Sequence, residues 1–172
     1  DLAGEARLID AMAPRSARIL DAGCGPGRVG STLAELGHEV VGVDVDPVLI
    51  AEAQREHPGA TWLVGDLAEL DLPAAGVAAD YDVIVCAGNV MTFLAPSTRS
   101  LVVSRLGAHL ADGGRLVVGF GAERGYPFDE FRANAEAAGL VLDLEIGTWD
   151  LRPFTPESDF LISVLSRPAS AA

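Results

Sequence analysis

Residues 18–30 read Arg-Ile-Leu-Asp-Ala-Gly-Cys-Gly-Pro-Gly-Arg-Val-Gly and carry the clearest structural signal in the chain. The stretch begins as an apolar strand and passes into a turn rich in glycine. Glycine is needed there because it adopts positive φ without strain and places no Cβ between the backbone and a ligand. A helix is expected over residues 28–36, ending before Gly37. The unpaired N–H groups at the start of such a helix favour an anionic group.

Further short apolar runs alternate with helical patterns along the chain. Nearly continuous apolar strands are typical of a parallel sheet that is covered by helices on both faces. The sequence therefore predicts a three-layer, doubly wound α/β sheet. The expected strands in this part cover residues 18–20, 40–43, 61–64, 83–85 and 116–118. The expected helices cover residues 28–36, 47–57, 96–110 and 128–138.

The end of the chain departs from this alternation. Residues 141–149 and 159–165 are strand-like runs joined by a loop that contains two prolines and no helical pattern. Consecutive strands without a crossover helix pair antiparallel, so the sheet is expected to end in a reversed hairpin. Residues 1–14 are expected to form one short helix, the remainder of a truncated lid, and residues 168–172 a frayed tail. The whole chain, residues 1–172, is predicted to be a single domain.

Composition excludes several classes of protein. The 172 residues include 12 basic and 25 acidic side chains, a net charge of −13, so no basic face is available for nucleic acid or an anionic membrane surface. Cys24 and Cys86 lie far apart, which leaves neither a zinc site nor a disulfide framework. We expect both thiols to pack as small apolar groups. No apolar run reaches the about 20 residues of a membrane span, and a reducing cytoplasm is the expected compartment.

Two acids extend the signal of the glycine turn. Asp44 ends the second expected strand, where an acid can bind ribose hydroxyls, and Asp66 follows the third strand at the same sheet edge. A glycine turn and two acids in register describe a site for an adenosine-containing molecule. Residues 25–30 also have the GxGxxG spacing of dinucleotide-binding turns, which leaves an NAD-type oxidoreductase as an alternative. The lack of a second domain and the acid at position 66 argue against it.

Four segments resemble, in order, the successive motifs of class I S-adenosylmethionine-dependent methyltransferases. They are residues 20–27, 41–44, 65–67 and 81–85. The resemblance implies a seven-stranded sheet in the order 3-2-1-4-5-7-6 with strand 7 antiparallel, which agrees with the expected hairpin. It also implies S-adenosylmethionine as cofactor, S-adenosylhomocysteine as product and no metal.

The resemblance assigns roles to individual residues. Asp21 would orient the glycine loop, which would lie against the methionine part of the cofactor. Asp44 would bind the ribose, and Asp66 and the Leu67 N–H would bind adenine, with Val45 beside the ring. Residues 87–89 would pass beneath the sulfonium and border the acceptor. The complete set of expected cofactor residues is Asp21, Gly23, Cys24, Gly25, Gly27, Asp44, Val45, Asp66, Leu67, Ala87, Gly88 and Asn89.

The acceptor side is less defined. Loops after the fifth and sixth strands should wall a pocket for a small molecule that is methylated on an O or N atom. The candidates for this pocket are Asn89, Tyr126, Trp149 and Arg152. No catalytic base is assigned, because His38, His57 and His109 are all expected to be structural or solvated. For that reason a non-catalytic cofactor-binding module stays open as a second alternative.

Overall fold

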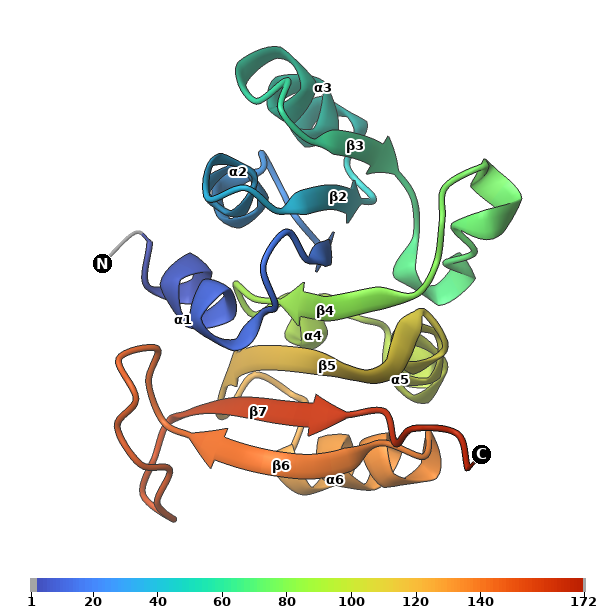
Figure 1. Cartoon of the computed structure of the whole chain (residues 1–172). Coiled ribbons are helices and arrows are strands. Elements are labelled where there is room, and N and C mark those ends of the chain that lie inside the picture. The colour runs from blue at the N-terminus through green and yellow to red at the C-terminus, as the bar shows by residue number, and fades with distance from the viewer. Residues whose placement is uncertain (1–2, 172) are drawn as a thin grey trace.

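Seven strands form one sheet, and the computed structural model describes residues 3–171 of the chain. The strands are β1 (Arg18–Ala22), β2 (Glu39–Asp44), β3 (Thr61–Val64), β4 (Tyr81–Cys86), β5 (Leu110–Gly121), β6 (Val141–Ile146) and β7 (Phe160–Ser166). Their order is β3-β2-β1-β4-β5-β7-β6 (Figure 1). Strands β1 to β5 pair in parallel, whereas β7 runs antiparallel to both β5 and β6. The predicted strand order and the reversed strand are confirmed.

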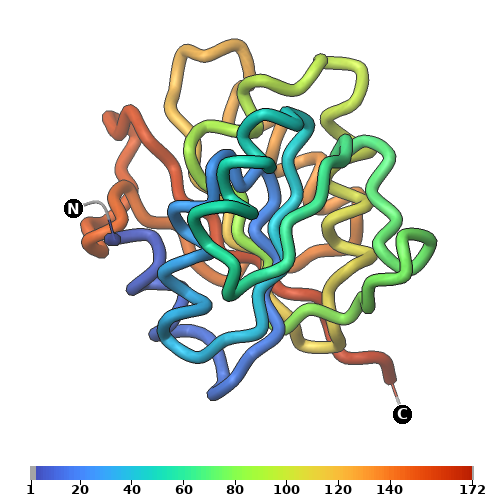
Figure 2. The backbone as a smooth tube through the Cα atoms, turned by 90° about the horizontal axis from the view of Figure 1, so that it is seen from above, coloured from blue at the N-terminus to red at the C-terminus, as the bar shows by residue number. Residues whose placement is uncertain are grey.

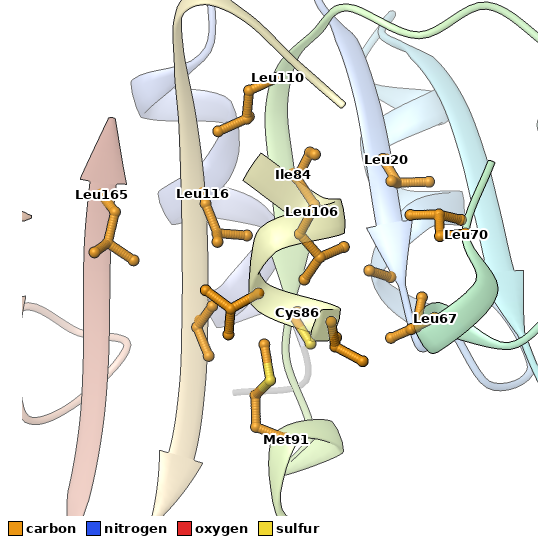
Figure 3. Close-up of a cluster of buried hydrophobic side chains, with 14 of the residues drawn as sticks. Leu20, Leu67, Leu70, Ile84, Cys86, Met91, Leu106, Leu110, Leu116 and Leu165 are labelled. Atoms are coloured by element: carbon orange, nitrogen blue, oxygen red, sulfur yellow. The ribbon is translucent and has the colours of Figure 1, made fainter. Parts of the chain in front are cut away.

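Helices cover both faces of the sheet, as the apolar strands predict. They are α1 (Gly4–Met12), α2 (Arg28–Glu35), α3 (Pro47–Glu56), α4 (Val90–Phe93), α5 (Arg99–Ala108) and α6 (Phe128–Ala137), with short 3-10 turns η1 (Leu67–Glu69), η2 (Pro73–Ala75) and η3 (Pro96–Thr98). One face packs against α1 and α2, the other against α4, α5 and α6. On the second face Leu20, Ile84, Leu116 and Leu165 from four strands pack with Leu106 of α5 (Figure 3).

The local signals for helix ends are present where the sequence predicts them. Pro47 is the first residue of α3, and the Asp46 side chain caps it by accepting a hydrogen bond from the Val48 N–H at 2.8 Å. Gly37 follows the end of α2 with φ of +97°, and Gly139 follows α6 with φ of +76°. Both helices therefore end in the left-handed conformation that glycine adopts without strain.

One predicted helix is wrong in its extent. Residues 96–110 do not form a continuous helix: they comprise η3, α5 and the first residue of β5. Leu110 pairs with Tyr81, because β5 is longer than its apolar centre indicates. Helix α4 precedes this region and was not predicted, since four residues are too few to show a helical period.

Helix α1 and the segment that follows β7 lie on opposite sides of the molecule (Figure 2). The expected N-terminal helix is present as α1, while residues 168–171 follow β7 without regular structure. Residues 1, 2 and 172, which belong to the expected helix and tail, lie outside the described residues. Both cysteines are free and buried, as expected, and burial raises the pKa of each thiol.

Candidate functional site

A pocket of about 430 Å³ opens at the carboxyl edge of β1, β2 and β3. Its volume is within the range of small-molecule sites, about 300–1,000 Å³. Five of the expected cofactor residues line it together, although they come from three separate loops. They are Gly23, Asp44, Val45, Asp66 and Leu67. This convergence is the geometry that a shared adenosyl site requires.

Asp44 joins the glycine loop to the end of β2. Its Oδ2 accepts a hydrogen bond from the Gly25 N–H at 2.8 Å, and its Oδ1 accepts one from the Asp46 N–H at 2.9 Å. A carboxylate oxygen can accept two hydrogen bonds. Asp44 can therefore hold the loop and still accept hydrogen bonds from the hydroxyls of a ligand.

Asp66 has a structural role beside its place in the pocket wall. Its Oδ1 accepts a hydrogen bond from the Ala68 N–H at 2.8 Å, so it is the N-cap of η1. This cap holds Leu67 against the pocket, with the Leu67 side chain buried in the core. Val45, two-thirds exposed, borders the same pocket from the end of β2.

Asp21 lies beneath the glycine loop. It is 3% exposed, and its Oδ2 accepts a hydrogen bond from the Gly30 N–H at 2.9 Å. Burial raises the pKa of this carboxyl group to about 7, although the Gly30 N–H and the Arg28 guanidinium oppose the shift. The side chain thus ties the end of β1 to the first turn of α2, on either side of the loop.

The three glycines of the turn have different reasons to be glycine. Gly23, Gly25 and Gly27 all have positive φ, at 76°, 53° and 90°. A Cβ on Gly25 would meet nothing within 4 Å, which leaves space for a ligand above the loop. A Cβ on Gly23 would lie 2.6 Å from the Val90 side chain, and one on Gly27 would lie 2.8 Å from Trp62.

The opposite wall of the pocket is apolar, and sequence reasoning missed it. It consists of α4 and the residues that follow it: Val90, Phe93, Leu94, Ala95 and Thr98. Phe93 is 78% exposed. An exposed aromatic ring beside a pocket that also holds two acids is the pattern of a ligand contact. The sequence feature that could have predicted this wall is the apolar run directly after residues 87–89.

Residues 87–89 connect the pocket to the other half of the sheet. Asn89 has φ of +62°, and its Oδ1 accepts a hydrogen bond from the Gly121 N–H at the end of β5 at 2.8 Å. Ala87 is buried against the α1 side of the sheet, and Gly88 is exposed with φ of +70°. The segment therefore lies between the ends of β4 and β5 and leads into Val90 in the pocket wall.

The three candidates from the later loops are not brought together. Tyr126 is 1% exposed in the core, where it stacks on Phe120 at 5.4 Å and its hydroxyl accepts a hydrogen bond from Asn134. Trp149 borders a different cavity, of about 520 Å³, between α1 and residues 149–151. The Arg152 side chain is 77% exposed, 3.5 Å from Asp150.

The three histidines make contacts within the fold, through the side chains of His38 and His109 and the main chain of His57, and none of them lines the pocket. His38 Nδ1 accepts a hydrogen bond from the Ala17 N–H, and its Nε2 lies 2.9 Å from Asp10. His109 Nδ1 lies 2.7 Å from the Arg105 carbonyl. The His57 carbonyl accepts a hydrogen bond from the Trp62 indole.

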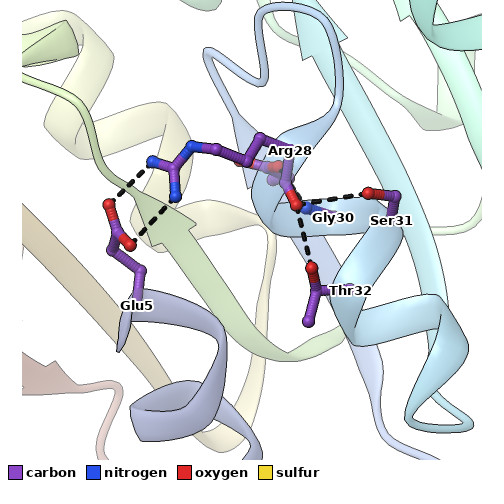
Figure 4. Close-up of polar contacts among 6 residues, drawn as sticks. Glu5, Arg28, Gly30, Ser31 and Thr32 are labelled. Atoms are coloured by element: carbon purple, nitrogen blue, oxygen red, sulfur yellow. Dashed lines mark hydrogen bonds and ion pairs between the residues drawn. The ribbon is translucent and has the colours of Figure 1, made fainter. Parts of the chain in front are cut away.

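An ion pair holds α1 against the first turn of α2 (Figure 4). The Arg28 guanidinium donates to both carboxylate oxygens of Glu5, at 2.7 and 3.0 Å. Burial, the largest single influence, would raise the pKa of Glu5, but the hydrogen bond and the charge of Arg28, together with a backbone hydrogen bond, outweigh it and the pKa is lowered. A bidentate pair of this kind fixes orientation as well as distance.

Residues 3–171 contain neither a cluster of metal ligands nor a membrane-spanning helix. No cluster of three or more His, Cys, Asp or Glu side chains there could hold a metal ion. In the same residues, every helix is too short or too polar to cross a bilayer.

Comparison with known proteins identifies the family. Residues 19–114 match the family described as "Methyltransferase domain". The chain belongs to the class I S-adenosylmethionine-dependent methyltransferases. S-adenosylmethionine is the cofactor of this family, and the matched segment of this methyltransferase contains the glycine loop, both pocket acids and residues 87–89.

Individual relatives agree with this assignment. A TehB-like S-adenosylmethionine-dependent methyltransferase from Corynebacterium glutamicum is 48% identical, with a TM-score of 0.92 over 97% of this chain and 89% of that one. An uncharacterised methyltransferase of Mycobacterium bovis is 35% identical over 114 residues, 64% of this chain and 54% of that protein. The chain thus spans about half the length of that curated relative. The S-adenosylmethionine-bound amino pentose methyltransferase CalS10 of Micromonospora echinaspora, at 22% identity and a TM-score of 0.75, shows the shared fold.

Proposed function

We propose that this methyltransferase transfers a methyl group from S-adenosylmethionine to an O or N atom of a small molecule in the cytoplasm. The observation that carries the proposal is the single pocket in which Gly23, Asp44 and Asp66 meet. Gly23 and Asp66 follow β1 and β3, and Asp44 is the last residue of β2, so three separate segments of the chain converge on one pocket. Family membership supports the same reaction.

The pocket suits an adenosyl group on chemical grounds. Asp44 keeps free lone pairs for ribose hydroxyls while it holds the Gly25 N–H. Asp66 and the Leu67 backbone lie where an adenine edge would be bound, and the apolar side chains of Val45 and Phe93 border the same space. Carboxylates for the sugar and apolar surfaces for the base are the groups that adenosine needs. The residues present therefore fit the cofactor.

The chemistry requires alignment above all. Bound S-adenosylmethionine would supply a methyl group on a positively charged sulfur, a good leaving group. The chain has to hold the acceptor atom in line with that methyl group, which can lower the barrier by several kcal/mol without an acid or base. The apolar wall of α4 excludes water from one side of the pocket. A proton acceptor is needed only if the acceptor group must lose a proton, as a hydroxyl does.

We place the acceptor beyond Asn89, toward the loops after β5 and β6. Asn89 is held by the Gly121 N–H at the boundary between the two halves of the sheet. Trp149 and Arg152 remain the candidates for acceptor contacts, whereas buried Tyr126 offers no surface to a ligand. The net charge of −13 favours a small molecule over nucleic acid as the partner.

Calorimetry with S-adenosylmethionine and with NAD, followed by an acceptor screen that measures S-adenosylhomocysteine release, tests this function. We expect binding of S-adenosylmethionine alone and turnover with at least one small hydroxyl or amine compound. Binding of NAD in its place would show an oxidoreductase. Tight binding of S-adenosylmethionine without turnover on any acceptor class would show a non-catalytic module.

A further inference from the structure

The side chain of Trp62 in β3 lies directly beneath the glycine loop. It is 4% exposed, and three glycines from three different elements surround it. A Cβ added to Gly27, Gly30 or Gly42 would lie 2.8, 2.9 or 2.3 Å from an indole carbon. No side chain fits at such distances. At these three positions, in the loop, the first turn of α2 and the centre of β2, a side chain would overlap the space that the indole ring fills.

The ring itself is held in one position. Its Nε1–H donates to the His57 carbonyl at 2.7 Å, at the end of α3. The Trp62 carbonyl accepts a hydrogen bond from the Gln54 side chain of the same helix at 3.1 Å. Ile50 and Ala53 of α3 pack against the ring together with Cys24 of the glycine loop. These residues form a small core, separate from the two that cover the main faces of the sheet.

This small core reaches the two parts of the pocket that would bind the cofactor. Cys24 belongs to the loop, and a Cβ on its neighbour Gly25 would meet nothing within 4 Å. Gly42 pairs with Trp62 across β2 and β3, two residues before Asp44. Asp44 in turn accepts the hydrogen bond from Gly25. The indole therefore supports the loop from below and the strand that carries the acid from the side.

We infer that Trp62 is a positioning residue for the cofactor site. The ring sets the height and slope of the glycine loop beneath the ligand, and it does so without touching the ligand. A smaller side chain would leave a void under Gly27, and the loop would lose the support that keeps Gly25 and Asp44 in register. The inference rests on the proposed function, since it assigns the cofactor to this loop.

The two tryptophans of the chain make a spectroscopic test possible. In the Trp149→Phe variant, Trp62 is the only tryptophan, and its emission is recorded during titration with S-adenosylhomocysteine. We expect the emission to change and to saturate with the dissociation constant that calorimetry gives. In the matched Trp62→Phe variant, which retains only Trp149, emission should stay constant. A tryptophan that only fills the core would not respond to the ligand.

Affinity and hydrogen exchange give the second test. Trp62→Leu should weaken S-adenosylhomocysteine binding about tenfold, Trp62→Phe should restore part of the loss, and Leu101→Ala, on the surface of α5 outside the pocket, should leave affinity within about twofold. In the ligand-free protein, Trp62→Leu should speed amide exchange over residues 23–30 and leave β4 and β5 unchanged.

The outcomes of these experiments distinguish a failure of the positioning role of Trp62 from a failure of the proposed function. If the wild-type protein does not bind S-adenosylhomocysteine, the proposed function fails, and the exchange of residues 23–30 still decides whether Trp62 supports the loop. If the wild type binds but Trp62 emission stays flat and both Trp62 variants keep full affinity, the positioning role is overturned. Should Trp62→Leu not fold, the emission of Trp62 and the affinity of Trp62→Phe decide alone.

Discussion

The two halves of the sheet edge differ in how strictly they hold the candidate site. The segments at the ends of β1, β2 and β3 are bonded to one another: the Gly25 N–H donates to the Asp44 side chain, and the Gly65 N–H donates to the Asp44 carbonyl. After β5 and β6, the candidates separate: Tyr126 lies in the core, Trp149 beside another cavity and Arg152 in solvent. Under the proposed function, the first half would bind the cofactor that the family shares, and the second half would adapt to a particular acceptor.

We expect the largest effect on cofactor affinity in the half of the sheet edge that is formed by the ends of β1, β2 and β3. Asp44→Ala removes a charged acceptor that holds Gly25 and is available to ribose, so S-adenosylmethionine affinity should fall about 10- to 100-fold, or about 1.5–3 kcal/mol. Calorimetry measures it. Asp46→Ala, which removes only the cap of α3, is the control and should leave affinity nearly unchanged. Unaltered affinity in Asp44→Ala would refute the ribose assignment.

The dependence of folding stability on pH tests the role of Asp21, which lies beneath the glycine loop in the same half of the sheet edge. Burial raises the pKa of Asp21 to about 7, so the folded state binds a proton that the unfolded state releases near pH 4. Stability from this group is complete below about pH 4 and is lost progressively as pH rises toward 7. Denaturant unfolding measures this decline. Asp21→Asn, which can still accept from Gly30, should abolish it, and an equal slope in that variant would contradict the assignment.

A smaller effect is expected from the apolar wall of the pocket. Phe93→Ala should weaken S-adenosylhomocysteine binding about 3- to 10-fold, because a stacked aromatic face contributes about 1 kcal/mol beyond its area. Phe93→Tyr should keep the affinity. Leu101→Ala, which removes another exposed apolar side chain on α5, serves as the control. Equal affinities in all three variants would remove α4 from the site.

We expect the smallest effect on catalysis in the other half, which is formed by the loops after β5 and β6. Tyr126→Phe removes a hydroxyl that binds only Asn134 among the described side chains, so stability should fall by about 1 kcal/mol and methyl transfer should stay within about twofold. Unfolding and steady-state rates measure the two quantities. A large loss of kcat with unchanged stability would return Tyr126 to the acceptor site and weaken the contrast between the halves.

Local sequence patterns were sufficient for the sheet and for the acidic side of the pocket. Each sequence signal reflects the conformation that the backbone adopts at that place. The signals are the continuous apolar strands, Pro47 at the start of α3 and the glycines after β1. The carboxyl ends of parallel strands share one edge, so Asp44 and Asp66 could be placed together before their contacts were known.

Only the tertiary structure could assign Trp62, Phe93 and Tyr126. All three are aromatic residues in apolar surroundings, yet one supports the glycine loop, one faces the pocket and one is buried behind α6. How deeply such a side chain is buried, and which way it points, depends on which elements pack together, and these can be far apart in the sequence. The local spacing of apolar residues carries no information about that packing. Backbone geometry is dictated by neighbours in sequence, whereas the surroundings of a large side chain are dictated by neighbours in space.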